Sequence, residues 1–154
     1  MHSLYVMRHG QAEASAPSDE LRPLTPHGVK EVSSNSQSFL SNKAFDYVFV
    51  SPYLRAQQTW KTVLKHSVQF TVCETVPWVT PDVDTQPILD HLLALDGDHL
   101  SILLVCHQTF AGRLATHLCG GPKHGIHVDT AAILHIETEV FAGQCGKLIN
   151  IYSN

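Results

Sequence analysis

Basic residues and long apolar runs are both scarce in this sequence of 154 residues. Ten lysines and arginines stand against fourteen aspartates and glutamates, so the formal net charge is −4. A chain without a basic surplus has no general positive field to attract a nucleic-acid backbone. No run approaches the roughly 20 apolar residues that a membrane-spanning helix needs. The composition therefore predicts neither a nucleic-acid partner nor a membrane segment.

Cysteine and histidine motifs of the usual kinds are missing too. The four cysteines form no C-x-x-C pair, which argues against a disulfide framework and against a zinc ribbon. The apolar stretch Leu4–Met7 is too short for the apolar region of a signal peptide. Together these features favour reduced thiols and a cytoplasmic location. The eleven histidines include no H-E-x-x-H motif, and the nearby His124 and His127 lack partners at ligand spacing, so no metal or other cofactor is expected.

What the sequence does contain is an alternation of strand and helix signals. Strands are predicted at residues 4–7, 47–50, 70–76, 102–105, 131–136 and 148–152, the last two as a hairpin-like edge. Helices are predicted from Pro26 to about Asn42, from about Ser51 to His66, over 88–95, and over 108–119. The strand at 102–105 is apolar throughout, as in a sheet covered on both faces. The sequence predicts one α/β domain over residues 1–154, a three-layer α/β/α sandwich with a mostly parallel central sheet.

The first two helices share a starting pattern. Thr25-Pro26 and Ser51-Pro52 each place a capping side chain before a proline, which is typical of a helix N-terminus. The helical stripes predict that Val29 in the first helix and Leu64 in the second face the core.

Two histidines follow apolar strands directly. His9 comes after the strand at 4–7 and Arg8, and His107 comes after the strand at 102–105 and Cys106. Ligands of open α/β sheets bind at the carboxyl ends of the strands. If the two strands are neighbours in the sheet, the two imidazoles face one another across the same crevice.

An arginine in the first turn of the second predicted helix points to an anion at the same place. Arg55 opposes the helix dipole there, and an anion held between the guanidinium and the helix amides resolves the conflict. Arg22, just before another helix start, could join this cluster. Arginine suits bidentate phosphate binding, and neutral histidine offers a nitrogen nucleophile. The pattern therefore predicts a pocket for phosphate, or for sulfate in its place.

These residues resemble the signature of the histidine phosphatase superfamily, and most of all its SixA-type bacterial phosphohistidine phosphatases. The resemblance covers almost the whole chain and rests on Arg8-His9-Gly10, Pro23-Leu24-Thr25 with Gly28, Ser51-Pro52 with Arg55, Ala56 and Thr59, and His107. It implies an α/β/α fold, an enzyme intermediate phosphorylated on histidine, and no metal.

The mechanism expected from this resemblance starts with attack by His9 on phosphorus. Arg8, Arg55 and a protonated His107, assisted by Arg22, would spread the charge of the phosphoryl oxygens. A general acid is harder to find, because residues 76–81 contain no carboxylate where relatives that cleave sugar phosphates would carry one. The remaining candidates for the acid are Asp19, Asp82 and Asp84.

Three functions stay open at the level of sequence. The first is a phosphatase that acts on phosphohistidine in a partner protein, either a phosphorelay domain or a sugar-transport carrier. The second is a phosphomonoesterase of the same superfamily that acts on small molecules. The third is an adaptor that binds phosphorylated partners without turnover.

Overall fold

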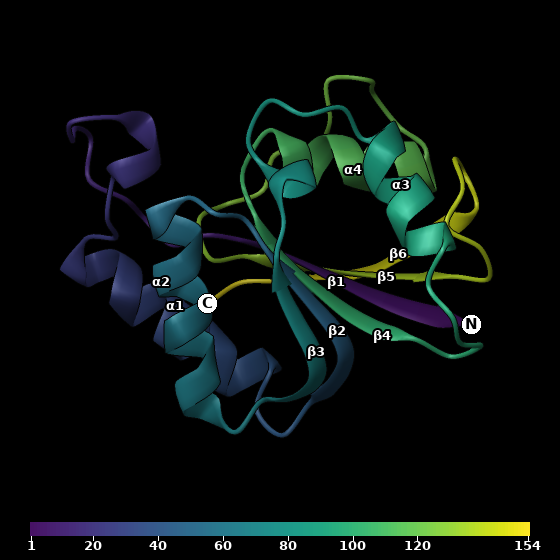
Figure 1. Cartoon of the computed structure of the whole chain (residues 1–154), viewed down its shortest axis with the longest axis horizontal. Helices are drawn as coiled ribbons and strands as arrows, with labels where there is room; N and C mark the ends of the chain where they lie inside the picture. Colours follow the sequence, from purple (N-terminus) through teal and green to yellow (C-terminus); the bar gives the residue numbers. More distant parts are fainter.

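One six-stranded sheet runs through the protein, with two helices on each of its faces (Figure 1). The computed structural model describes all 154 residues. Its elements in chain order are β1 (His2–Arg8), η1 (Asp19–Leu21), α1 (Pro26–Phe39), β2 (Ala44–Val50), α2 (Leu54–Val63), η2 (Leu64–His66), β3 (Gln69–Thr75), η3 (Pro77–Val79), α3 (Gln86–Leu93), β4 (Ser101–Cys106), α4 (Phe110–Cys119), β5 (Ile133–Thr138) and β6 (Gly146–Tyr152).

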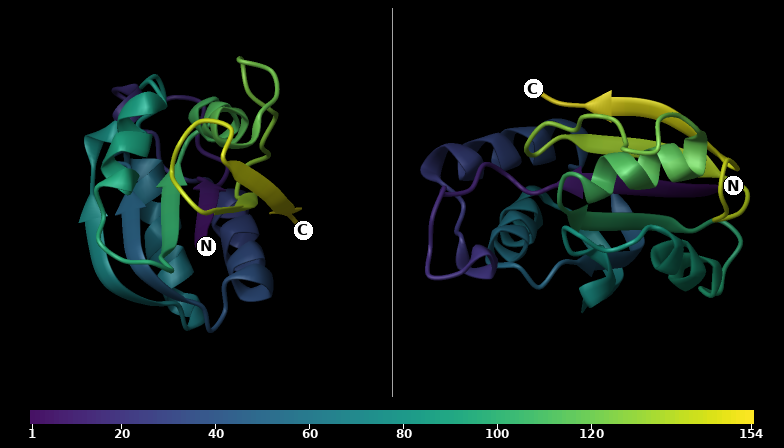
Figure 2. Two further views of the ribbon diagram at one scale, coloured as in Figure 1. Left: turned by 90° about the vertical axis from the view of Figure 1, so that its right-hand side faces the viewer. Right: turned by 90° about the horizontal axis from the view of Figure 1, so that it is seen from above.

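The strand order is β3-β2-β4-β1-β5-β6. The first four of these strands are mutually parallel, whereas β5 pairs antiparallel with both β1 and β6. Helices α1 and α2 cover one face, and α3 and α4 cover the other (Figures 1 and 2). The predicted α/β/α sandwich and its antiparallel edge are confirmed. None of the helices combines the length and the apolar character needed to cross a membrane.

The sheet divides the hydrophobic core into two clusters, and β4 shows how. Ile102 and Leu104 pack into the cluster under α3 and α4, while Leu103 and Val105 pack into the cluster under α1 and α2. All four are fully buried. Because successive strand residues point to opposite faces, a strand covered on both sides must be apolar throughout. Packing on both faces fixes the central strands in place, so the carboxyl ends of neighbouring strands stay side by side.

The two predicted helix starts have different outcomes. Thr25 caps α1 as expected, since its hydroxyl accepts a 2.9 Å hydrogen bond from the Gly28 amide. The start predicted at Ser51 is wrong: the N-cap of α2 is Tyr53. Ser51 is fully buried, and its hydroxyl lies 2.7 Å from the ring of His107. The same hydroxyl accepts a 3.3 Å hydrogen bond from the Tyr53 amide, but the regular α-helix begins only at Leu54.

Two residues predicted to face the core are exposed. Val29 and Leu64 each keep 40% of their surface in solvent. Helix α1 instead buries Gly28, Val32, Asn35 and Ser36, the neighbouring stripe of the same helix. Leu64 belongs to the 3-10 turn η2. The tighter winding of that turn ends the α-helical stripe of α2.

Candidate active site

Three neighbouring strands end at the same edge of the sheet, and each is followed by a polar residue. His9 follows β1, His107 follows β4, and Ser51 follows β2. The His9 amide donates to the Cys106 carbonyl at 2.9 Å, and the Ser51 amide donates to the Val105 carbonyl at 3.0 Å. These backbone bonds extend the sheet register past the strand ends. The rings of His9 and His107 meet edge to face, with centroids 5.1 Å apart and an interplanar angle of 64°.

The tautomer of His9 follows from its two hydrogen bonds. Nδ1 lies 2.6 Å from the Gly10 carbonyl, which can only accept, so Nδ1 carries the proton. Nε2 receives a 3.2 Å hydrogen bond from Nε of Arg55 and therefore presents a lone pair. Burial, with the positive charges of Arg55 and Arg8, lowers the pKa of His9 to about 4. His9 is thus neutral near pH 7, with a nucleophilic nitrogen on the side of Arg55.

Gly10 holds this arrangement through its backbone. Its amide donates to the Thr59 hydroxyl at 3.1 Å, and that hydroxyl donates to the Arg55 carbonyl at 2.7 Å. A Cβ at residue 10 would lie 2.7 Å from the Gly28 carbonyl oxygen and from Val32 Cγ2. Only glycine fits so close to α1. The loop after β1 is therefore pinned between α1 and α2.

Arg55 is 3% exposed and connects His9 with Asp19. Besides its contact with His9, it donates from Nη1 to the Asp19 carbonyl oxygen at 2.7 Å and from Nη2 to Asp19 Oδ2 at 3.2 Å. Arg22 reaches the same carboxylate, with Nε 2.8 Å from Oδ1. Asp19 thus ties two guanidinium groups together at the mouth of the site. Arg22 contributes to the lowered pKa of His9, so it belongs to the same field of positive charge.

Arg8 is a half-buried cation, and one N–H group of its guanidinium makes no hydrogen bond within the protein. Its Nη1 donates to the Val128 carbonyl at 2.8 Å, while its Nε is buried and has no partner in the protein. Buried donors are nearly always paired. Its charge also depresses the pKa values of His9 and His107. Arg8 and Arg55 therefore surround the two imidazoles with positive charge, the setting that an anion would stabilise.

Without a bound anion His107 is neutral, and its protonation beside a phosphoryl group stays a prediction. His107 is 1% exposed. Burial, with the neighbouring His9 and Arg55, lowers its pKa to about 2. No carboxylate hydrogen-bonds to its ring, whose Nε2 contacts the Ser51 hydroxyl. Adjacent Cys106 is no alternative nucleophile, because complete burial raises the pKa of its thiol to about 12.

The two buried histidines predict a pH dependence of stability. Unfolded histidine protonates near pH 6.5, whereas both folded rings stay neutral to lower pH. Below pH 6.5 the unfolded state therefore binds more protons, so the free energy of unfolding falls as the pH decreases. For His9 we expect a loss of roughly 2 kcal/mol between pH 7.5 and 5.

Urea unfolding at the two pH values measures this loss. His9→Asn should lose less stability than the wild type on acidification, by about the amount assigned to His9. The exposed His27 supplies the control variant, His27→Asn, which should behave like the wild type. An equal pH dependence in all three proteins contradicts the assignment.

The three candidates for a general acid have different surroundings. Asp19 is 58% exposed at its side chain, and the hydrogen bond from Arg22, with nearby Arg55, holds its pKa below the usual range. An ionised carboxylate has no proton to donate. Asp82 is exposed, and its charge makes the smallest of the contributions to the raised pKa of Tyr53, which is caused mainly by burial.

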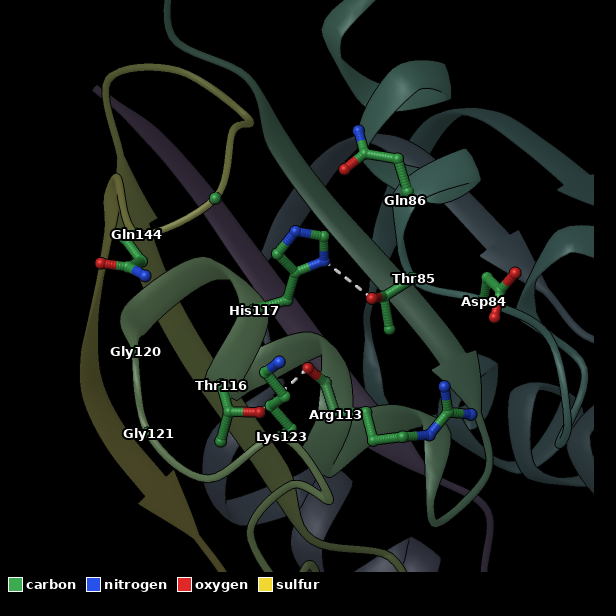
Figure 3. A pocket seen from close by; sticks show the side chains of 11 residues that line it. Asp84, Thr85, Gln86, Arg113, Thr116, His117, Gly120, Gly121, Lys123 and Gln144 are labelled. Carbon is green, nitrogen blue, oxygen red and sulfur yellow. Dashed lines mark hydrogen bonds between the residues drawn. The ribbon is translucent and has the colours of Figure 1, made fainter.

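Asp84 belongs to a different part of the molecule. It lines a polar cavity of about 710 Å³ together with α4 residues Arg113, Thr116 and His117 (Figure 3). The residues that line this cavity include neither His9 nor His107. This placement argues against Asp84 as the general acid for a group bound at His9.

Ser51 and Tyr53 are site residues that the sequence reasoning missed. Ser51 contacts His107, and the Tyr53 ring lies edge-on to His107 with centroids 5.0 Å apart and under the Arg55 guanidinium at 4.9 Å. The signal for Ser51 was present, because it follows an apolar strand as His9 and His107 do. Its reading as a helix cap concealed it. Tyr53 carried no comparable signal.

Comparison with known proteins identifies the family to which this chain belongs. A sequence model of the histidine phosphatase superfamily (branch 1) matches residues 4–76, which include Arg8, His9 and Arg55 but end before His107. Phosphohistidine phosphatase SixA of Escherichia coli K12 is 34% identical over 120 residues, 77% of this chain and 74% of SixA. This chain belongs to the histidine phosphatase superfamily. It is accordingly a phosphatase.

The comparison extends to a second SixA sequence, to a solved SixA structure and to a phosphatase that shares the fold. The SixA homolog of Haemophilus influenzae is 32% identical over 130 residues, 77% of each chain. The structure of SixA complexed with tungstate superposes with a TM-score of 0.86 at 29% identity, covering 98% of this chain and 96% of that one. The phosphoserine phosphatase of Entamoeba histolytica, in complex with 3-phosphoglyceric acid, shares the fold at a TM-score of 0.69 and 17% identity, over 100% of this chain and 98% of that one. The fold alone therefore leaves the substrate open.

Proposed function

We propose that this phosphatase removes phosphate from phosphohistidine on a partner protein, through a covalent intermediate on Nε2 of His9. The observation that carries the proposal is the tautomer of His9. Gly10 holds the proton on Nδ1, and Nε2 offers its lone pair beside Arg55. Related SixA has been solved with tungstate, a tetrahedral oxyanion like phosphate. This supports the proposal that Arg8 and Arg55 hold a phosphoryl group next to His9.

The reaction follows in two steps. In the first, His9 Nε2 attacks phosphorus and the bond between phosphorus and the substrate nitrogen breaks, while the imidazole leaves as a neutral ring because its other nitrogen carries a proton taken up from solvent. In the second, water attacks phosphorus and the bond to His9 breaks, giving inorganic phosphate and neutral His9. The guanidinium groups stabilise the oxygens in both steps, as expected for catalysis by charge and positioning. The Gly10 carbonyl disperses the positive charge that the ring acquires.

The state of Asp19 favours a nitrogen leaving group over an oxygen one. An alkoxide leaving group gains much from proton donation, whereas imidazole leaves as a far weaker base. Asp19 is the carboxylate in contact with Arg55, and its lowered pKa keeps it ionised. Phosphohistidine is therefore the substrate class whose cleavage depends least on proton donation from the enzyme.

Two further expectations from the sequence stay predictions. They are the cytoplasmic location, which was predicted from the cysteines, and the single domain over residues 1–154.

Substrate comparison separates the proposal from the small-molecule alternative. We expect the kcat/KM for a ³²P-labelled phosphohistidine domain to exceed that for a sugar phosphate by at least about 100-fold, because the alkoxide leaving group of a sugar phosphate has no acid to protonate it here. Equal or faster turnover of the sugar phosphate would favour the phosphomonoesterase.

A trapping experiment tests the covalent step and the adaptor alternative. Quenching a single turnover under alkaline conditions, where phosphohistidine survives, should leave acid-labile label on residue 9. Binding of the phosphorylated domain without release of phosphate would favour the adaptor. Hydrolysis with no label on the enzyme at any time point would argue for direct attack by water.

A further inference from the structure

Ser51 is linked to His107 by geometry that constrains where the protons lie. The serine is fully buried at the end of β2, and its amide is fixed on the Val105 carbonyl. Its Oγ lies 2.7 Å from Nε2 of His107 and accepts a 3.3 Å hydrogen bond from the Tyr53 amide. These are the two hydrogen-bond contacts that the hydroxyl makes.

Counting protons decides which of the two groups donates. A serine hydroxyl has one proton to give. Because the Tyr53 amide can only donate to Oγ, the one acceptor left for the hydroxyl proton is Nε2 of His107. If Nε2 carried the proton instead, both the hydroxyl proton and the lone pair of the buried Nδ1 would lack a partner, whereas the opposite tautomer leaves only Nδ1 unpaired; each buried polar group without a partner costs about 1–3 kcal/mol. Nε2 of His107 is therefore the unprotonated nitrogen of a neutral ring.

The other nitrogen of the same ring completes the argument. Nδ1 of His107 is buried and has no partner in the protein. In the tautomer set by Ser51 it carries the proton, so it is a buried donor without an acceptor. Buried polar groups of this kind are rare and call for a ligand or water. The ring stands 5.1 Å from His9, where the proposed function places the phosphoryl group.

We propose that Ser51 is a positioning residue that fixes His107 in its Nδ1–H tautomer, so that a neutral N–H group meets a phosphoryl oxygen. This inference rests on the proposed function for the identity of that acceptor. The tautomer matters because the opposite one would turn a lone pair toward the oxygen and repel it. His107 then acts in the resting site as a neutral hydrogen-bond donor, and the positive charge comes from Arg8 and Arg55. The neutral state agrees with the strongly lowered pKa of His107.

Nitrogen NMR of ¹⁵N-histidine-labelled protein reads the tautomer directly. At pH 7 we expect a protonated, pyrrole-type signal for Nδ1 of His107 and an unprotonated, pyridine-type signal for Nε2. Adding inorganic phosphate should shift the Nδ1–H signal. A protonated Nε2 in the wild type overturns the proposal, and this measurement needs no variant to fold.

Removal of the hydroxyl tests its effect on catalysis. In Ser51→Ala we expect the Nδ1–H preference of His107 to be lost and kcat/KM to fall roughly 10- to 100-fold, since a misplaced tautomer removes a transition-state contact. Ser51→Thr keeps a hydroxyl and should restore the tautomer and part of the activity. Wild-type tautomer and full activity in Ser51→Ala would overturn the proposal.

A matched control is available in α1. Ser36 is also fully buried, and its hydroxyl has no partner. Ser36→Ala should therefore change neither the His107 signals nor kcat/KM. The trapping experiment keeps the two ideas separate: a wild-type enzyme that never carries label on His9 defeats the proposed covalent step, whereas the NMR result tests Ser51 alone.

Discussion

Replacing His9 by alanine removes the nitrogen that we propose attacks phosphorus, and we expect kcat to fall at least about 10⁴-fold, as when other enzymes lose their nucleophile. No neighbouring group can substitute. His107 Nε2 is occupied by Ser51, and the Cys106 thiol is buried and protonated. Single-turnover assays with the ³²P-labelled phosphohistidine domain measure the loss. The label that the wild type carries on residue 9 should be absent.

The control for this experiment is a histidine outside the cluster. His66 makes one side-chain hydrogen bond, with its Nε2 2.8 Å from the Ser33 hydroxyl, and it lies in η2. His66→Ala should keep kcat within a few-fold of the wild type. His9→Ala should still bind inorganic phosphate, because Arg8 and Arg55 remain. Near-normal turnover in His9→Ala would end the proposed mechanism.

Replacing Arg55 by lysine keeps the charge, yet we expect kcat/KM to fall roughly 10²- to 10³-fold. The guanidinium uses all three of its nitrogens: Nε contacts His9, while Nη1 and Nη2 contact Asp19. A lysine ammonium is a single point of charge and cannot make this planar set of contacts while also meeting the phosphoryl oxygens. Steady-state kinetics should show the loss mainly in kcat.

Arg113 offers a matched arginine at a distance from His9. Its guanidinium is likewise held by hydrogen bonds, in this case to the backbone carbonyls of Val83 and Pro81. Arg113→Lys should lower the melting temperature without lowering kcat more than a few-fold. If both variants lost activity equally, the role of Arg55 would be structural rather than specific to the phosphoryl group.

Much of the site could be predicted because its signals are local. A histidine that directly follows an apolar strand lies at the edge where ligands bind in an α/β sheet. His9 and His107 both satisfy this rule, and the structure places them together. Arg55 stood out because a cation in the first turn of a helix conflicts with the dipole unless something compensates.

Errors arose where a residue had two local interpretations. Ser51 followed by proline suited a helix cap as well as a strand-end site, and only the position of His107 decides between them. The neutral state of His107 in the anion-free site could not be predicted, because a pKa depends on the whole surroundings. No sequence pattern showed that burial and two nearby cations would act on this ring. Val29 and Leu64 were misplaced because small shifts in helix phase or winding change the buried face.

By itself, the sequence determined the order of strands and helices along the chain and the apolar strands of a sheet covered on both faces. It also determined which residues follow the carboxyl ends of those strands. These are set by periodicity and by neighbours along the chain. The tertiary structure decided the protonation of His9 and His107 and the pairing of Arg55 with Asp19. Those properties arise from burial and from contacts between segments far apart in the chain, which no local pattern encodes.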